Sequence, residues 1–445
     1  MTRTTTATDE PGPQGAVLEG APWPRGAPVP ARLPRLLSGT PLIGHGAHLS
    51  HWGELPVAGR SLIEEIARAG LRGRGGAGFP AADKLLAASA SSRFGRRAVV
   101  VANGTEGEPA SFKDKTLLAL APHLVIDGAV AAARAIRATE VVVAVDLESR
   151  RALGVMDQAI AERQAAGVDA PIHVRVTATP SRYLTGQETA LVQWLNGGDA
   201  KPTVVPPRPS DRGVGGRPTV VHNVETLAHI GLIARFGAAW YRGVGTAEDA
   251  GTLLVTVTGG VERPGVYEVP WGEPVGELVA AAGGVLAEAS GLLVGGYYGT
   301  WLPVTAADTR LAVAPLAALG ASAGAGVVAV LPPGVCPLVE AARVTRWLAD
   351  QSAGQCGPCV NGLPALASAL EAVAAGEPTG RAEAALMRWA AMVEGRGACH
   401  LPDGTARFVR STLAVFGDHV IEHRRRGPCP AAPPVLATPP PGGWR

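Results

Sequence analysis

Lysine is scarce in this chain of 445 residues, and the scarcity is informative. Lysine and arginine together number 40, but lysine occurs only at Lys84, Lys113, Lys115 and Lys201. Arginine and lysine are not interchangeable, because the ammonium is a compact charge whereas the guanidinium is a planar fork. In a chain that prefers arginine this strongly, each lysine suggests a place where a compact cation is needed.

The chain also lacks an excess of charge and a disulfide framework. Its net charge is +2, which gives no field to attract nucleic acid or a membrane surface. Five cysteines, behind a start without an apolar signal segment, indicate a reducing compartment, so we expect a cytoplasmic protein. The uncharged stretch 311–339 is rich in Ala and Gly and is broken by Pro332 and Pro333, so we expect no transmembrane segment.

What the chain does have is an alternation of valine-rich strands and helices. Strands are predicted over 97–103, 140–146 and 172–178, and helices over 61–70, 122–137 and 148–166. Nearly continuous Val runs predict a parallel sheet that is covered on both faces. The ligand of such a Rossmann-like α/β domain lies beyond the carboxyl ends of its strands.

Changes in composition divide the chain further. From about residue 250, short strands with Gly-Pro turns predict a small β-grasp-type module, and from about 336 the chain is helical. We expect a disordered lead-in rich in Pro and Gly over 1–35, an α/β domain over 36–245, a β-grasp module over 246–335, a helical domain over 336–428 and a proline-rich tail over 429–445.

A glycine-rich loop follows the first predicted helix. The segment LRGRGGAGFP (71–80) has glycine at 73, 75, 76 and 78, which lets backbone N–H groups approach an anion. It follows a helix, so it is not the usual dinucleotide fingerprint. Lys84 comes one short turn later, and polar clusters follow predicted strands at NGTEGEPASFKDK (103–115), YLTGQETALVQWL (183–195) and GGRPTVVHNVETL (215–227).

Taken together, these motifs resemble one family. GLRGRGGAGFP, EPxxFKD, GxETAL, RPTxxxNVETL and a C-terminal cysteine segment occur in the order found in the 51-kDa flavoprotein subunit of NADH:quinone oxidoreductase (complex I) and in the diaphorase subunits of NAD-linked hydrogenases and formate dehydrogenases. The resemblance runs from about residue 58 to 425. It implies FMN, NAD(H) and an iron–sulfur cluster of the 4Fe-4S type as cofactors, and GGVERPGVYEVP resembles the family's soluble-ligand-binding β-grasp domain.

The resemblance also implies roles for individual residues. Phe79 would stack on the adenine of NADH, Lys84 would hold the flavin by its charge, and Asn103 would bond the isoalloxazine edge. Glu108 would lie by the NADH ribose. The rest of the implied binding wall consists of Gly73, Arg74, Gly75, Gly76, Gly78, Glu106, Tyr183, Gly186, Gln187, Glu188, His222 and Asn223.

Several positions depart from the family pattern. Members usually carry Asp, Glu and Asn where this chain has Thr105, Gln187 and His222. An aromatic residue is replaced near Ala87 and a lysine at Val205. Each change removes a charge, a hydrogen-bonding group or a stacking face. The sequence therefore leaves two hypotheses, an NADH dehydrogenase-type electron-entry flavoprotein and a non-catalytic scaffold or regulatory homologue.

The segment QSAGQCGPCV (351–360) carries the spacing C-x-x-C at Cys356 and Cys359, and Cys399 lies forty residues further on. By resemblance these are three ligands of the cluster, and the first ligand position is Ala353. Five outcomes remain open: a cube with one iron held by water or another side chain, a three-iron form, zinc with His400 as an additional ligand, no metal, or a redox dithiol. Electrons would then pass to a ferredoxin-like or iron–sulfur partner subunit, with the chain as a peripheral part of a larger redox complex.

Three further features are predicted from the residues alone. Cys336 would lie about 20 Å from the cysteine ladder, by which we mean Cys356, Cys359 and Cys399, because a predicted helix over 337–350 separates them. Cys429 is expected to be a free surface thiol. The histidines of GHGAHLSHW (44–52) are expected in a solvated loop rather than as metal ligands. HRRRG (423–427) suits the carboxyl end of a last helix.

Overall fold

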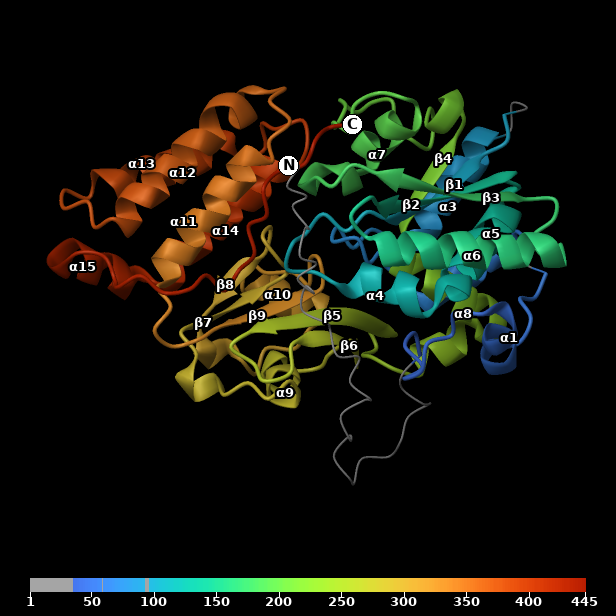
Figure 1. The fold of residues 1–445 in the computed structure, drawn as a ribbon, viewed down its shortest axis with the longest axis horizontal. Helices are drawn as coiled ribbons and strands as arrows, with labels where there is room; N and C mark the ends of the chain where they lie inside the picture. The colour runs from blue at the N-terminus through green and yellow to red at the C-terminus, as the bar shows by residue number, and fades with distance from the viewer. Residues whose placement is uncertain (1–34, 58, 93–95) are drawn as a thin grey trace, which may run out of the picture.

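A parallel sheet with helices on both faces forms the first half of the structure, a computed structural model that describes residues 35–57, 59–92 and 96–445 (Figure 1). The predicted lead-in therefore lies, apart from Arg35, outside the described residues. Its strands are β1 (Val99–Gly104), β2 (Glu140–Asp146), β3 (His173–Thr179) and β4 (Thr219–Asn223), in the order β3-β2-β1-β4. All pairs are parallel, which confirms the predicted α/β class.

The helices of this half are α1 (His45–Trp52), α2 (Ser61–Ala69), α3 (Ala81–Ser91), α4 (Lys113–Leu120), α5 (Pro122–Ile136), α6 (Arg150–Ala166), α7 (Glu188–Leu195) and α8 (Val224–Arg242). Alternate residues of each strand explain the layers. Val100 and Val143 face the core beneath α5 and α8, whereas Val101 and Val142 face α7. Helices α5 and α8 touch closely because Gly128 has no side chain: a Cβ there would lie 1.6 Å from the Leu227 carbonyl oxygen.

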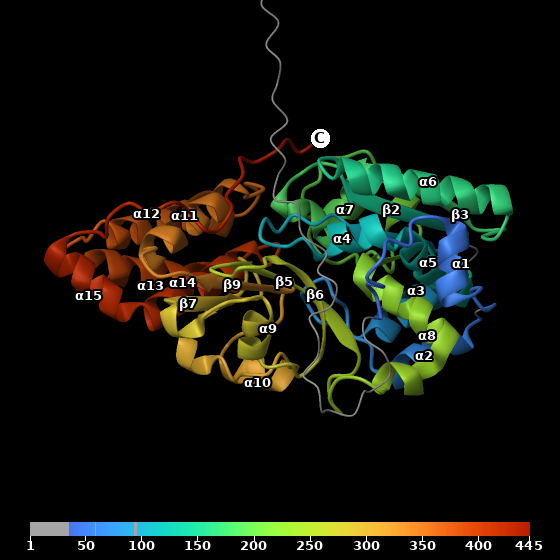
Figure 2. The ribbon, with the colours of Figure 1, turned by 60° about the horizontal axis from the view of Figure 1, so that its bottom comes forward.

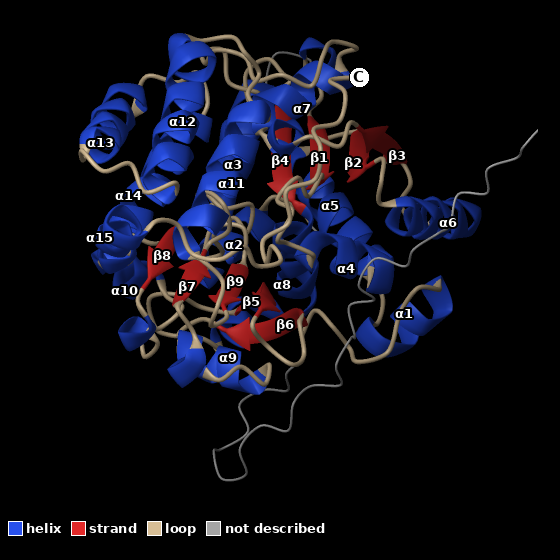
Figure 3. Cartoon of the chain, turned by 60° about the vertical axis from the view of Figure 1, so that its left-hand side comes forward, coloured by secondary structure: helices blue, strands red, loops and turns tan. Residues whose placement is uncertain are grey.

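A second, mixed sheet lies beside the first, and Figure 3 shows the two groups of strands apart. Its strands are β5 (Thr252–Gly259), β6 (Gly265–Pro270), β7 (Gly291–Val294), β8 (Thr300–Leu302) and β9 (Val327–Leu331), in the order β6-β5-β9-β7-β8. Helices α9 (Val275–Ala281) and α10 (Val313–Ala318) cover one face (Figure 2). The other face packs on the C-terminal helices through Leu293 and Ala329.

The last part of the chain is a helical bundle. It consists of α11 (Pro337–Asp350), a π-helical turn (Pro358–Gly362), α12 (Leu363–Ala374), α13 (Arg381–Val393), α14 (Leu401–Val415) and α15 (Gly417–Arg426). Helix α15 ends in a run of basic residues, as its sequence predicted, where cations meet the negative end of the helix dipole.

The residues after α15 form an extended strap (residues 429–445) that crosses the bundle and reaches the α/β domain beside α7 (Figure 1). Glu340 on α11 accepts hydrogen bonds from the backbone N–H groups of Val435 and Leu436. Further along, the Arg182 guanidinium lies over the Trp444 ring, with its carbon 3.9 Å from the ring centre. The Trp444 carbonyl accepts a 3.0 Å hydrogen bond from Ala200 N–H. The strap therefore joins the bundle to the α/β domain.

The prediction that the histidines near the start of the chain lie in a solvated loop was wrong. His45, His48 and His51 lie in helix α1, and His48 is buried with its Nε2 atom 2.6 Å from Asp127 Oδ2 on α5. The local Gly content favoured a loop, but the buried carboxylate of Asp127 provides a partner from a distant segment.

No single helix among the described residues is long and apolar enough to cross a membrane. Helices α4 and α5 together have the length and composition of a span, but they meet at an angle of 96°.

Candidate functional site

The glycine-rich loop after α2 is closed on itself and packed against α8. Arg72 and Pro80 form a β-bridge, and Gly73 N–H donates a 2.8 Å hydrogen bond to the Phe79 carbonyl. Gly76 and Gly78 have φ values of +102° and +62°, which residues with a side chain rarely adopt. A Cβ at Gly75 would lie 3.4 Å from Asn223 Cβ, so the bare backbone of the loop faces the end of β4.

Two asparagines stand beside each other at the carboxyl ends of neighbouring strands. Asn103 of β1 is in register with Asn223 of β4. Asn103 donates to the Gly186 carbonyl at 2.8 Å and accepts from Thr105 N–H. Asn223 caps α8 by accepting from Glu225 N–H at 2.9 Å. A parallel sheet therefore gathers these amides at one edge, as the strand pattern predicted.

An ion pair stands at the same edge. Lys84 Nζ lies 2.9 Å from Glu188 Oε2 and 3.3 Å from the Val221 carbonyl oxygen. The Lys84 and Glu188 side chains are 30% and 34% exposed, so a ligand can reach both. Behind them His222 is buried, and burial together with the charge of Lys84 lowers its pKa to about 3. The His222 imidazole is therefore neutral.

The neighbouring residue Gln187 hydrogen-bonds to the backbone at the start of α7. Its Oε1 atom accepts hydrogen bonds from Thr189 N–H and Ala190 N–H at 2.8 and 3.0 Å, which caps α7. A capping oxygen satisfies N–H groups that have no partner within a helix. The amide at this position thus has a structural use.

The two glutamates after β1 differ in their surroundings. Glu106 is buried and accepts from Ser111 Oγ and from two N–H groups at the start of α4. Glu108 is buried against the second sheet, where it accepts from Tyr297 N–H at 2.8 Å and from the Tyr183 hydroxyl at 3.3 Å. Burial raises the pKa of Glu108 to about 7. Glu106 thus holds the loop after β1 against α4, and Glu108 holds it against the second sheet.

Other predicted residues of the loop have mixed exposure. Arg74 is buried, and its guanidinium donates to the Tyr241 hydroxyl and the Thr252 carbonyl. Phe79 is 49% exposed, which leaves its ring accessible for stacking. Tyr183 is enclosed by the rings of Tyr298 and Trp347.

A buried charge group beside the loop was not predicted from the sequence. Lys113 Nζ lies 2.7 Å from Asp114 Oδ1 and 2.9 Å from Glu225 Oε2. Burial acts to lower the pKa of Lys113, but these carboxylates outweigh it and the pKa is raised. The group borders a cavity of about 200 Å³ that the loop, Trp271 and the segment 321–326 enclose. The scarcity of lysine was the signal that pointed to Lys113.

The three predicted metal ligands lie in one part of the bundle. Cys359 and Cys399 are buried and Cys356 is half-buried. Burial, together with the neighbouring thiols, raises the pKa of Cys359 to about 12. The buried hydroxyl of Tyr298, which is close to Cys399 and Cys359, has no hydrogen-bond partner among the described residues. Ala353 offers only a methyl group.

His400 is not placed as a ligand. Its side chain is 89% exposed, and its Nδ1 atom lies 3.1 Å from Asp403 Oδ2. The prediction for Cys429 was wrong, because this thiol is half-buried and lies 3.1 Å from His423 Nε2 instead of standing free at the surface. The sequence could not show that the chain doubles back after α15.

Comparison with known proteins places this arrangement. Three family models match: the Nuo51 FMN-binding domain over 66–232, the SLBB domain over 254–296 and the NADH-ubiquinone oxidoreductase-F iron–sulfur binding region over 340–423. The chain is 33% identical over 383 residues to a NADH-quinone oxidoreductase F-type subunit of Rhizobium meliloti, covering 83% of this chain and 90% of the relative. It is 32% identical to the corresponding F-type subunit of Mycobacterium tuberculosis, covering 84% of this chain and 86% of that one.

A hydrogenase subunit is similar as well. The chain is 33% identical to the alpha subunit of the NAD-reducing hydrogenase HoxS of Cupriavidus necator, over 80% of this chain and 59% of that subunit. Among solved structures, the NAD+-reducing NiFe hydrogenase in the air-oxidised state matches with a TM-score of 0.77 and 30% identity, over 88% of this chain and 67% of that one.

The fold and the site therefore define a flavoprotein subunit of the NADH dehydrogenase type. Such subunits oxidise NADH with FMN and pass electrons to an iron–sulfur cluster within a larger complex. The chain belongs to the family of the F-type subunits of NADH-quinone oxidoreductase. This confirms the resemblance drawn from the motifs.

The residues present fit the family's two kinds of cofactor to different degrees. For FMN, the bare loop backbone, the accessible Lys84 ammonium and the amides at the strand ends provide the donors that a phosphate and a polar ring need. For the cluster, three thiols are gathered, but a cube has four irons to ligate, and no fourth cysteine stands at position 353. The flavin site fits, and the cluster site fits with three cysteines.

Proposed function

We propose that this chain is itself an active electron-entry subunit, which binds FMN and NADH at the edge of the parallel sheet. The observation that carries the proposal is the Lys84–Glu188 pair, which stands accessible beside the glycine loop and the strand ends. FMN, when bound, accepts a hydride from NADH and releases its electrons singly. No acid–base pair is required of the protein, whose task is to position and to tune charge.

In this proposal each group has a positioning role. The loop backbone from Gly73 to Gly78 approaches the ligand closely, and Lys84 supplies the compact positive charge. Phe79 offers an open ring face for stacking on the NADH adenine. Asn103 and Asn223 present fixed amides at the strand ends, and the remaining wall consists of Arg74, Glu106, Glu108, Tyr183, Gly186, Gln187 and His222.

The parts of the chain would divide the work as the sequence suggested. Residues 36–245 would hold flavin and NADH, residues 246–335 would form the soluble-ligand-binding module, and residues 336–428 would hold the cluster. Cys356, Cys359 and Cys399 are the proposed cysteine ligands.

Electrons would leave for an iron–sulfur partner subunit in the cytoplasm. The similar proteins are named as subunits, which supports a partner of this kind. The acceptor is proposed by its chemistry alone: a one-electron carrier that follows a flavin which gives up electrons singly.

The test is the visible spectrum of anaerobically purified protein before and after NADH is added. A flavin band with an iron–sulfur shoulder that bleaches on NADH supports the proposal. A flavin band that dithionite bleaches but NADH does not would remove NADH oxidation and keep FMN binding. Protein that stays colourless after reconstitution with FMN, iron and sulfide would favour a scaffold homologue, for which Ala353 is the specific observation.

A further inference from the structure

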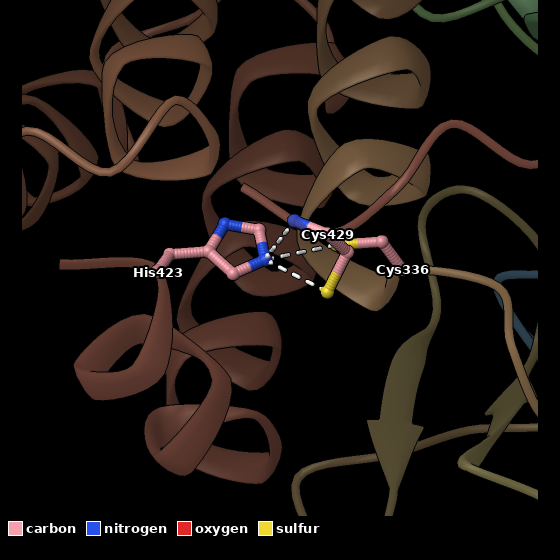
Figure 4. A group of neighbouring side chains, drawn as sticks. All are labelled: Cys336, His423 and Cys429. Carbon is pink, nitrogen blue, oxygen red and sulfur yellow. Dashed lines mark hydrogen bonds between the residues drawn. The ribbon is translucent and has the colours of Figure 1, made fainter. Parts of the chain in front are cut away.

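A second group of possible metal ligands lies in the bundle, separate from the cysteine ladder. Cys336 precedes α11, His423 is in the last turn of α15, and Cys429 follows six residues later. Their ligand atoms all lie within 4.8 Å of one another (Figure 4). His423 Nε2 is 3.4 Å from Cys336 Sγ and 3.1 Å from Cys429 Sγ. Three segments of the chain thus converge on one point.

The orientation of the imidazole is fixed from behind. His423 Nδ1 lies 2.7 Å from the carbonyl oxygen of Ala374, at the end of α12. A carbonyl can only accept, so Nδ1 carries the proton and Nε2 presents its lone pair to the two sulfurs. Histidines that bind metals are held in this way, by a backbone or carboxylate acceptor on the other ring nitrogen.

Without an ion, the single lone pair of Nε2 faces too many donors. The thiols of Cys336 and Cys429 point to it, and so does Cys429 N–H at 3.2 Å. A neutral imidazole nitrogen accepts one good hydrogen bond. A cation in the middle, with both thiols deprotonated, would use the lone pairs of all three side chains at once.

The distances suit zinc after a small adjustment. With Zn–S near 2.3 Å and Zn–N near 2.0 Å, a tetrahedral site separates sulfur and nitrogen by about 3.5 Å. The observed separations of 3.4 and 3.1 Å are slightly shorter. Cys429 belongs to an extended segment, so it can move outward by the few tenths of an ångström required. Two sulfurs and an imidazole favour zinc over Mg²⁺ or Ca²⁺, which prefer oxygen.

The site is enclosed on two sides. Cys336 is 5% and His423 1% exposed, whereas Cys429 is half-buried. Because Cys429 is the most exposed of the three residues, we expect a fourth ligand to approach from its side. Helix α11, with 14 residues, separates Cys336 from the cysteine ladder by about 20 Å, so the two groups cannot share ligands.

We propose that Cys336, His423 and Cys429 bind a zinc ion, with water in the fourth position, and that this ion fastens the start of the strap. Binding replaces the two thiol protons by one divalent cation, so two protons are released and no electrons are exchanged. The strap continues from Cys429 to Trp444, which rests on Arg182 of the α/β domain. An ion at Cys429 would thus fix the end of the strap that lies on the bundle.

The test is the zinc content of the full-length protein after purification with zinc in the medium and removal of loosely bound metal. The variants are Cys429→Ser and His423→Gln, and the matched control is Cys356→Ser in the ladder. We expect stoichiometric zinc in the unchanged protein and in Cys356→Ser, and a loss of most of it in the two site variants. Zinc-edge X-ray absorption should show two sulfurs at about 2.3 Å and one imidazole.

Several outcomes would overturn the proposal. One is an unchanged protein that holds no zinc. Another is zinc that disappears in Cys356→Ser and stays in Cys429→Ser, which would place it in the ladder. A third is a nonreducing peptide map that joins Cys336 to Cys429 by a disulfide. If a site variant fails to fold, the zinc-edge X-ray absorption spectrum of the unchanged protein still tests the proposal. Four sulfur ligands around the zinc, or none, would contradict a site of two cysteines and one histidine.

Discussion

The flavin wall, which is the set of residues proposed to bind FMN and NADH, and the cysteine ladder both depart from the family pattern. The structure accommodates the substitutions in the two places differently. In the flavin wall, Gln187 caps α7, Thr105 bonds to Asn103, and His222 is buried as a neutral ring. In the ladder, Ala353 replaces a ligand with a methyl group that can bond to nothing. A hydrogen-bonding position tolerates substitution by another polar group, whereas a metal-ligand position requires a lone pair.

The largest effect is expected from repair of the ladder. Ala353→Cys would add a fourth thiolate to Cys356, Cys359 and Cys399, and we expect the iron–sulfur chromophore to survive air at least about tenfold longer, because even outer-shell changes cost roughly 10- to 100-fold in metal affinity. The measurement is the bleaching rate together with the iron content. Ala353→Val, which adds bulk without a lone pair, is the control. Equal rates in the two variants would show that the position is not a ligand site.

Next in size is the removal of the cation from the flavin wall. Lys84→Met keeps the length of the side chain and removes its charge, so a charge-assisted hydrogen bond worth about 1.5–3 kcal/mol is lost. We expect FMN to bind roughly ten- to a hundredfold more weakly. Fluorescence titration with FMN measures this, and Lys201→Met, at a lysine beside Trp444, is the control. An unchanged affinity for FMN in Lys84→Met would show that the Lys84 ammonium does not hold the flavin.

A third prediction concerns pH and the contact between the two sheets. The pKa of Glu108 is raised from its usual 4.5 to about 7 by burial. The folded protein therefore holds a proton that the unfolded chain releases, so the group stabilises the fold fully below pH 4.5 and loses this contribution as pH rises through 7. The loss is at most roughly 3 to 4 kcal/mol, at roughly 1.36 kcal/mol for each of about 2.5 pKa units.

Glu108→Gln should remove that part of the pH dependence. We expect the variant to be less sensitive than the unchanged protein between about pH 5 and 8 in thermal unfolding, with the gap closing toward low pH. Glu106→Gln, at a glutamate that caps α4, is the comparison variant. A pH profile that is identical with and without Glu108 would mean that its carboxylate is already charged at neutral pH.

The smallest effect is expected from restoring a family residue to the flavin wall. In Gln187→Glu, a carboxylate oxygen can still accept from Thr189 N–H and Ala190 N–H. A negative charge at a helix start gains about 0.3–1 kcal/mol, so unfolding and FMN affinity should change little. Titration of FMN and thermal unfolding measure both. A gain of more than tenfold in FMN affinity would show that this departure was not absorbed.

The strands and most helices could be predicted because their pattern is local. The patterns at 140–146 and 172–178 predicted strands by themselves. Strand β2 occupies the predicted residues, and β3 lies one residue later than predicted. The edge of the sheet where Asn103 and Asn223 meet follows from parallel topology alone. The family motifs then identified the chemistry of that edge.

What could not be predicted depends on contacts between distant segments. Cys336 and His423 are 87 positions apart, and HRRRG offered a complete explanation as a helix end without any metal. Nothing in the local sequence indicates that the chain reverses after Arg426 to bring Cys429 back. Lys113 was visible as a rare residue and within the motif EPxxFKD, but its pairing with Glu225, which is 112 positions away, was not.

The strap has a consequence for how the molecule is made. Its contact with the α/β domain involves Trp444, so that contact cannot form until this residue has left the ribosome, although domains fold as they emerge. Until then the α/β domain and the bundle are joined by the second, mixed sheet and by the contacts that Arg182 and Tyr183 make with the end of α11. An affinity tag fused directly after Arg445, beside Asp199, would occupy the place where this late contact forms.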